Sequence, residues 1–303
     1  MHPILISIGS FHLPTYGTLL VLAILSAVYT IVRLGRREGQ DAGMLLDFTT
    51  WMLLVALVGA KVLMVISDWS FYRQNPGEIF STATLMAGGV FYGGFLAAVL
   101  FAIWYVRVNR LPFWKLADIF APAIVLGQSV GRLGCFAGGC DYGKPTTSRL
   151  AVVFTSAYAH EISGVPLGIP LHPTQIYESL ATFCIFGILL WQFRRKQWDG
   201  QIFLLYLALY GVARFFIEFL RGDEDRGFVF NHLLSTSQFI ALLAILTAAF
   251  LGVRLRREGG NPRGERRAAA DGNEPAGKTT ARGDTAQELQ PTAVAPAPKR
   301  LRR

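Results

Sequence analysis

The chain has 303 residues, of which 52% are hydrophobic and only 16% are charged. Soluble domains carry about 25% charged residues, so this composition excludes an ordinary soluble globular protein and indicates that lipid surrounds most of the chain. The net charge of +9 is concentrated in residues 254–303, which contain 12 Lys and Arg residues against 6 Asp and Glu residues. It therefore gives no argument for nucleic acid binding.

The amino-terminal sequence MHPILISIGSF contains no Lys or Arg. Cleavable signal peptides begin with a positively charged region, so we expect the first apolar segment to remain in the protein. Runs long enough to span a bilayer then recur along the chain, and we predict an all-α polytopic membrane protein with about seven transmembrane helices. They are expected at residues 16–32, 46–66, 88–106, 116–133, 174–193, 201–220 and 233–253.

The connections between these helices alternate between rich and poor in Lys and Arg. The rich ones lie at residues 33–37, 107–115 and 194–196 and after residue 253. The poor ones contain only Arg73, Lys144, Arg149 and Arg226. Because basic connections stay in the cytoplasm, we expect the N-terminus outside, in the periplasm, and the C-terminus in the cytoplasm.

Two regions with different composition follow from this pattern. Residues 1–253 form one transmembrane domain, which also contains the candidate site residues. Residues 254–303 are rich in Ala, Pro, Gly and charged residues and have few apolar side chains to bury. Such a composition is typical of disorder, so we predict a basic, disordered cytoplasmic tail.

The fourth apolar run contains the first candidate site. It is interrupted by Pro122 and Gln128, and it ends in GQSVGRLGCFAGGCDYGKPT, which includes Arg132. Arg binds phosphate through two parallel hydrogen bonds, and glycine allows the main chain to approach a ligand closely. We expect Arg132 to bind a lipid phosphate; the alternative is an arginine that extends to the headgroups without a specific role.

The long connection at residues 136–172 follows this run. A connection of this length is usually functional or disordered, and its aromatic and apolar residues favour an ordered lid that faces the membrane. Cys135 and Cys140 flank its start, either as a disulfide or as free thiols near Arg132. C-x4-C without a His or Asp cluster is a weak zinc signal, so no metal site is expected. Cys184, in the middle of a helix, is expected to be a small buried residue.

Polar residues in three other helices are further candidates. Tyr210, Arg214 and Glu218 follow at i, i+4 and i+8, which places them on one helix face. Ionisable residues within a membrane are functional candidates, although an Arg–Glu pair that holds the bundle together is the alternative. HPTQIYE at residues 172–178 begins a helix, and GGVFYGG at residues 88–94 favours close helix packing or a lipid headgroup slot.

These motifs together resemble the prolipoprotein diacylglyceryl transferase family over residues 10–255. The resemblance is carried by Tyr16-Gly17, GGVFYGG, the segment ADIFAPAIVLGQSVGRLGCF at 117–136, HPTQIYES at 172–179 and YGVARFFIEFLRGDEDRG at 210–227. Members transfer the diacylglyceryl group of phosphatidylglycerol to the lipobox cysteine thiol of a prolipoprotein, which forms a thioether and releases glycerol phosphate. The resemblance implies a location in the bacterial inner membrane. It implies prolipoprotein signal peptides and membrane lipid as partners, and no cofactor.

The resemblance also implies roles for individual residues. The family's essential arginines fall on Arg132 and Arg214. We expect catalytic roles for Arg132, Arg214 and Tyr92. We expect substrate contacts from Arg132, Tyr16, Tyr210, Glu218, Arg221, Gln175 and Gly143.

The chain departs from the family pattern at two places. Tyr92 stands where many members have a histidine, which is a proposed general base, and a tyrosine is better suited to positioning lipid. Cys135, Gly138 and Cys140 replace the polar residues of G-N-F-x-N-x-E. Two other functions fit the composition: a phospholipid-dependent transferase with another acceptor, and a small membrane transporter or flippase. The sequence lacks an internal repeat, which argues against transport.

Overall fold

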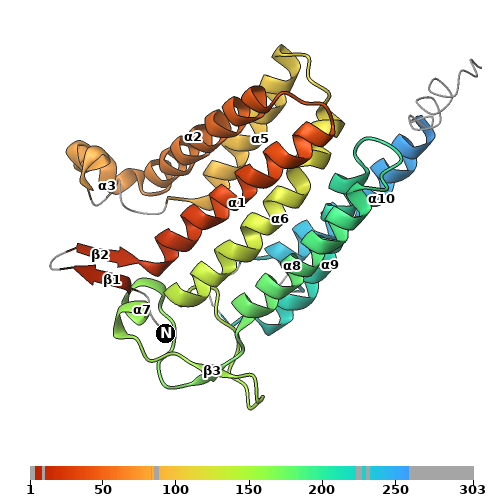
Figure 1. The fold of residues 1–303 in the computed structure, drawn as a ribbon. Coiled ribbons are helices and arrows are strands. Elements are labelled where there is room, and N and C mark those ends of the chain that lie inside the picture. Colours follow the sequence, from red (N-terminus) through yellow and green to blue (C-terminus); the bar gives the residue numbers. More distant parts are fainter. Residues whose placement is uncertain are drawn as a thin grey trace, which may run out of the picture. The chain divides into compact units, whose positions relative to one another are not determined.

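The computed structural model describes residues 4–8, 11–82, 84, 89–222, 227–229 and 233–258. Within these residues, seven helices are long and apolar enough to cross a membrane, as Figure 1 shows. They are α1 (Thr15–Arg37), α2 (Ala42–Ser67), α5 (Phe91–Val108), α6 (Phe113–Gly138), α8 (Thr174–Phe193), α9 (Gln201–Ile217) and α10 (Thr236–Glu258). The predicted all-α polytopic membrane fold is confirmed.

Short elements connect these helices. Three antiparallel pairs of strands are described: β1 (Ile4–Ile8) with β2 (Phe11–Pro14), β3 (Val152–Val153) with β4 (Pro170–Leu171), and β5 (Phe228–Val229) with β6 (Leu234–Ser235). The short helices are α3 (Trp69–Gln74), η1 (Pro76–Phe80), α7 (Ala157–Ser163) and η2 (Glu218–Leu220). The predicted tail begins within α10, and its residues 259–303, like Gly88 and Arg226, lie outside the described residues.

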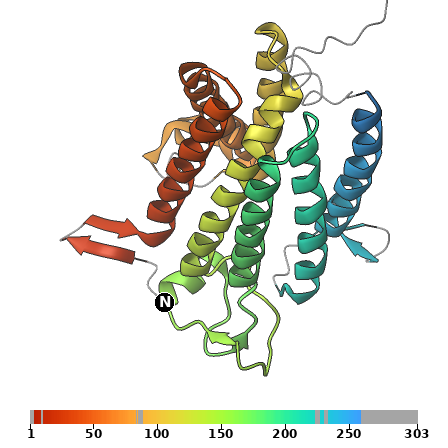
Figure 2. The ribbon, with the colours of Figure 1, turned by 45° about the vertical axis from the view of Figure 1, so that its right-hand side comes forward.

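Helix α6 occupies the middle of the bundle. It packs against α1, α8 and α9, while α2 pairs with α5 and α9 with α10, and Figure 2 shows the same neighbours from another side. Ile119, Ala121 and Val125 on α6 are wholly buried. This position explains why the least apolar of the seven spans tolerates Pro122 and Gln128, because protein rather than lipid surrounds it. The helix also continues beyond residue 133 to Gly138, further than its apolar run predicted.

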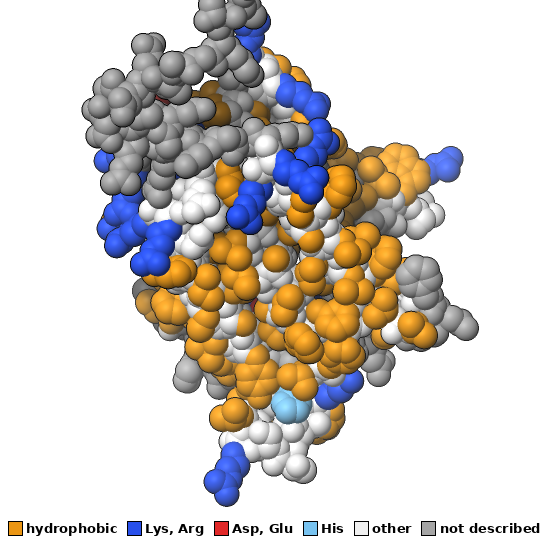
Figure 3. Space-filling view, turned by 90° about the vertical axis from the view of Figure 1, so that its right-hand side faces the viewer, with side chains coloured by type: hydrophobic (Ala, Val, Ile, Leu, Met, Phe, Trp, Pro, Cys, Tyr) orange, Lys and Arg blue, Asp and Glu red, His pale blue; other side chains and the backbone are white. Residues whose placement is uncertain are grey.

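The surface of the bundle is apolar where it would meet lipid. Leu100 on α5 is 67% exposed and Phe250 on α10 is also 67% exposed. Figure 3 shows a belt of hydrophobic side chains across one face of the molecule, with most of the visible Lys and Arg side chains on one side of the belt. A membrane would cover such a belt and leave the basic residues in water.

The long connection between α6 and α8 is ordered, as its apolar content predicted. It contains α7 and the β3–β4 pair, and it has a small core of its own. Phe154, Val165 and Leu171 are wholly or almost wholly buried in that core. The connection therefore packs as a unit beside the end of α6. Its predicted contact with the membrane remains a prediction.

The side chain of Asp118 on α6 caps the N-terminus of another helix, α9. It is wholly buried, and its carboxylate accepts hydrogen bonds from the backbone N–H groups of Gly200 at 2.8 Å, Ile202 at 2.9 Å and Phe203 at 3.0 Å. These groups begin α9, which has no side-chain cap of its own. Lys196 lies 3.4 Å from the same carboxylate. Asp118 thus acts as the N-cap of α9 from a different helix.

Replacing Asp118 by Ala is expected to destabilise the bundle. The substitution leaves three backbone N–H groups buried without their acceptor and removes one of the carboxylates that pair with Lys196, which costs about 3 kcal/mol in the free energy of unfolding. Denaturant unfolding in detergent measures this loss. The matched control is Asp199→Ala, since Asp199 pairs with the same lysine but its side chain is 44% exposed, and it is expected to cost less than about 1 kcal/mol. Equal losses in both variants would contradict the capping role.

Candidate active site

The carboxyl ends of α6 and α9 and the start of α8 lie at the end of the bundle that carries α7 and β3 (Figure 1). Arg132 lies near the carboxyl end of α6, and Arg214 lies near the carboxyl end of α9. Helix α8 begins at this end, after Pro173. Two of its first residues hold the loop that follows α6: Thr174 Oγ1 donates to the carbonyl of Asp141 and Gln175 Nε2 to that of Cys140, both at 2.7 Å.

Glu178 on α8 is the centre of a buried polar network. Its side chain is only 5% exposed. Its Oε2 atom lies 3.1 Å from Nε of Arg132 and 3.4 Å from NH1 of Arg214. The hydroxyl of Tyr210 donates to its Oε1 atom at 3.1 Å. One carboxylate therefore orients two arginines and a tyrosine that come from two other helices.

Asp141 holds a second pair of arginines. Its two carboxylate oxygens contact the guanidinium groups of Arg132 and Arg221 separately. Asp141 has φ of 59°, a left-handed conformation that Asp tolerates better than most residues. Although burial alone would raise it, Arg132 and Arg221 hold the pKa of Asp141 below its usual range. The two ion pairs therefore persist as the pH falls, and they are lost only when the pH drops through that lowered pKa.

Glu218 completes the network on the side of α10. Its Oε2 atom lies 3.0 Å from NH2 of Arg214, and the same NH2 group donates to Oγ of Ser237 at 3.2 Å. Among the described residues, the network thus holds the guanidinium groups of Arg132, Arg214 and Arg221 and the carboxylates of Asp141, Glu178 and Glu218. Buried charges are tolerated only when they are paired in this way.

Comparisons with known proteins show the family of this chain. The sequence pattern of the family described as prolipoprotein diacylglyceryl transferase matches residues 3–254. The chain belongs to this family. It is 34% identical over 260 residues to the phosphatidylglycerol–prolipoprotein diacylglyceryl transferase of Finegoldia magna, covering 85% of this chain and 97% of the relative. It is 35% identical over 251 residues to the protein of the same name from Clostridium tetani, covering 83% and 96%.

The structure of this family member brings most of the predicted site residues together. Arg132, Arg214, Tyr210, Glu218 and Arg221 all belong to the network. Their roles in substrate binding and catalysis stay predictions.

Three predicted residues lie at the edge of the network. Gln175 supports the loop through the carbonyl of Cys140, and its buried Oε1 atom has no hydrogen-bond partner among the residues that the structure describes. Gly143 pairs with Arg221 in an isolated β-bridge. Tyr16, at the start of α1, packs against Gly134 of α6, where a Cβ atom would lie 3.2 Å from its Cδ2 atom. The substrate contacts predicted for these three residues stay predictions.

Tyr92 is the exception. It lies on α5, is 52% exposed and forms an edge-to-face contact with Phe91. Helix α5 packs against α2 rather than against the helices that carry the arginines. Among the described residues, no hydrogen bond, ion pair or ring contact joins Tyr92 to the network. Its predicted catalytic role stays a prediction without a geometric argument.

Two members of the network were missed as site residues by the sequence analysis. Glu178 had a usable signal, because it follows Gln175 by three residues within HPTQIYE and thus shares its helix face. Asp141 follows the position where the family pattern has a glutamate, but the sequence does not show the left-handed backbone that turns its carboxylate toward the arginines. Cys184 was expected to be buried, but it is exposed on α8. Of the two alternatives for Cys135 and Cys140, the structure contains them as free thiols.

Gly143 lies where no side chain fits. A Cβ atom at this position would lie 2.4 Å from the carbonyl oxygen of His172 and 3.0 Å from that of Leu220. Both contacts are with backbone, and Gly143 N itself donates to His172 O at 3.1 Å. The loop therefore cannot move away without losing the pairing that positions Arg221.

Replacing Gly143 by Ala is expected to lower the rate of lipid transfer by about 100-fold, because a shift of about 1 Å at a reacting site has an effect of this size. A transfer assay with purified protein measures it. The control is Gly138→Ala, since a Cβ atom there meets no heavy atom within 4 Å, and it should keep the rate of the wild type. A fully active Gly143→Ala variant would contradict the tight packing of this loop.

Proposed function

We propose that the protein transfers the diacylglyceryl group of phosphatidylglycerol to the lipobox cysteine of prolipoproteins. The relatives' names specify phosphatidylglycerol and a prolipoprotein as substrates. In this reaction the acceptor sulfur bonds to the glycerol carbon, the bond from that carbon to the phosphate oxygen breaks, and the thiol loses its proton. The products are a thioether and glycerol phosphate.

One observation carries this proposal: Arg132 and Arg221 together hold a two-oxygen anion, the carboxylate of Asp141. The phosphodiester of a phospholipid presents two oxygens of the same kind. We infer that the lipid phosphate takes the place of this carboxylate between the two guanidinium groups. Arg is suited to the task because its planar fork donates parallel hydrogen bonds.

The same arginines fit the chemistry of the transfer step. Negative charge grows on the phosphate oxygens as the glycerol phosphate leaves, and fixed guanidinium groups in a site that excludes water stabilise that charge. The acceptor thiol, with an ordinary pKa of about 8.5, more readily forms its thiolate beside an arginine. Glu178 contributes by fixing the directions of Arg132 and Arg214.

The test is a reaction of purified protein with phosphatidylglycerol and a lipobox peptide. Mass spectrometry should detect a diacylglyceryl group joined to the peptide through a thioether. Lipid turnover without a peptide adduct would contradict the proposed acceptor. If folded protein shows no lipid turnover and forms no adduct, this result would contradict the proposed transferase activity.

We further propose that the chain lies in the bacterial inner membrane with its N-terminus outside. In a variant without the natural cysteines, Ser148→Cys, in the long connection, should then react with an impermeant maleimide added to intact spheroplasts. Gln197→Cys, in the basic connection between α8 and α9, should react only after the membrane is opened. Both positions are exposed. The reverse labelling pattern would contradict the orientation.

A further inference from the structure

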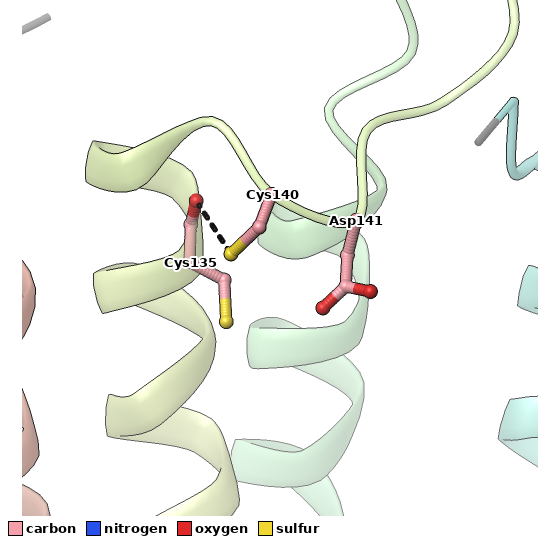
Figure 4. A group of neighbouring side chains, drawn as sticks. All are labelled: Cys135, Cys140 and Asp141. Atoms are coloured by element: carbon pink, nitrogen blue, oxygen red, sulfur yellow. Dashed lines mark hydrogen bonds between the residues drawn. The ribbon is translucent and has the colours of Figure 1, made fainter. Parts of the chain in front are cut away.

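Two thiols lie next to the arginine network and have no part in the proposed reaction. Cys135 is in the last turn of α6, three residues after Arg132, and Cys140 follows the end of that helix. Cys140 Sγ lies 3.6 Å from the carbonyl oxygen of Cys135. Both sulfur atoms and a carboxylate oxygen of Asp141 lie within 4.8 Å of one another (Figure 4).

The turn after α6 is responsible for this proximity. Gly139 ends the helix with φ of 80°, a left-handed conformation that reverses the chain direction. Cys140 is thereby folded back over the last turn of α6, and its side chain points toward Cys135, whose sulfur points along the helix (Figure 4). The two sulfur atoms lie within 4.8 Å of each other, and rotation of the two side chains brings them to the disulfide distance of about 2.05 Å.

A metal ion is the other ligand that such a group suggests, but the charges oppose it. The Asp141 carboxylate is already held by Arg132 and Arg221. Structural zinc takes four ligands, and here a cation would have two thiols and would lie beside two guanidinium groups. The geometry therefore favours redox chemistry of the two sulfur atoms over metal binding.

We propose that Cys135 and Cys140 are a redox modification site, which a small-molecule or protein disulfide oxidises to an intramolecular disulfide. One sulfur attacks the oxidant and releases the first of its two thiols. The other sulfur then attacks the mixed disulfide and releases the second. The two cysteines are oxidised by two electrons and lose two hydrogens, and the oxidant's disulfide gains both as two thiols.

The order of attack follows from the surroundings of Cys140. Cys140 donates its S–H to the backbone carbonyl of Cys135, which holds this sulfur in the thiol form, and the neighbouring Cys135 thiol and burial raise the pKa of Cys140 in the same direction. The thiolate is the attacking species in thiol–disulfide exchange. We therefore assign Cys135 as the sulfur that attacks the oxidant and Cys140 as the one that resolves the mixed disulfide.

This disulfide would act on the network through the backbone, and this step rests on the proposed function. Cys140 directly precedes Asp141, and its carbonyl accepts the hydrogen bond of Gln175. Drawing Cys140 toward α6 shifts the Asp141 peptide, whose carboxylate contacts Arg132 and Arg221. The oxidised protein is expected to transfer lipid at least about 10-fold more slowly, since a shift of about 1 Å in a reacting site costs up to about 100-fold.

The test uses the full chain with Cys184→Ser, so that only this pair of thiols remains. The protein in detergent with phosphatidylglycerol is treated with excess oxidised glutathione or with buffer and then desalted, which keeps the oxidant away from the acceptor peptide. Alkylation after denaturation, read by mass spectrometry, should find both thiols in the untreated sample. The treated sample should show none, with a mass lower by two hydrogens. Thiols that stay fully alkylated after treatment would overturn the proposal.

Transfer activity of the same samples separates the two proposals. Activity should fall on oxidation and return with a thiol reductant, and a disulfide that leaves activity unchanged would overturn the effect on the site. The control Cys140→Ser should show the same activity with and without oxidant, whatever its basal rate. Absence of transfer by the reduced protein would contradict the proposed function, whereas the alkylation result would still decide whether the disulfide forms.

Discussion

Replacing Glu178 by Gln is expected to lower kcat/KM for diacylglyceryl transfer by about 100-fold, the effect of a misplacement of about 1 Å in a reacting site. The substitution keeps the shape of the side chain but removes the charge that holds Arg132 at 3.1 Å and Arg214 at 3.4 Å. An amide also presents a donor to guanidinium groups that can only donate. The two arginines should therefore lose their common direction while the fold is retained.

The measurement for Glu178→Gln is steady-state kinetics with phosphatidylglycerol vesicles or micelles and a lipobox peptide. We expect most of the loss in kcat, because the arginines stabilise charge that develops only as the phosphate leaves. Glu161→Gln makes the same chemical change at an exposed position of α7, and it should behave as wild type. Wild-type kinetics for Glu178→Gln would contradict the central role of this carboxylate.

Replacing Arg132 by Ala is expected to have the larger effect, a loss of about 1000-fold in kcat/KM, because removing one preorganised donor at a developing anion costs up to about this much. Arg132 contacts Asp141 and Glu178 and so links both carboxylates. Arg132→Lys should restore no more than about 10-fold of this loss, because an ammonium group lacks the planar fork whose separate nitrogens reach Asp141 and Glu178.

The matched control for Arg132 is Arg149→Ala, since Arg149 is exposed in the connection after α6. Each variant is compared by its thermal unfolding in detergent as well as by its kinetics. An Arg132→Ala protein that unfolds like the wild type but has lost transfer would support a direct role in the reaction. An Arg132→Lys protein with wild-type activity would contradict the need for a two-pronged donor.

Hydropathy and charge alone were sufficient to predict the membrane fold. Runs of apolar side chains long enough for a bilayer place the seven spans, because each helix has to satisfy its backbone hydrogen bonds internally and cover them with apolar side chains. The i, i+4 spacing of Arg214 and Glu218 also predicted their pairing, since residues one turn apart lie on the same helix face.

Contacts between helices were decided only by the tertiary structure. A helical period states which residues share a face, but it does not state which neighbour that face meets. Glu178 therefore could not be recognised as the partner of Arg132 and Arg214, and Asp118 could not be recognised as the cap of a helix more than 80 residues away. In the same way, the packing of α5 against α2 left Tyr92 without a described contact to the arginines.

The chain reversal after α6 shows the same limit at a single turn. The sequence by itself determined that glycines, two cysteines and an arginine are close neighbours along the chain. Only the tertiary structure placed the carboxylate of Asp141 between Arg132 and Arg221. The reason is that the left-handed backbone at Gly139 and Asp141 is stabilised by contacts with α8, a separate helix, and not by local preference alone.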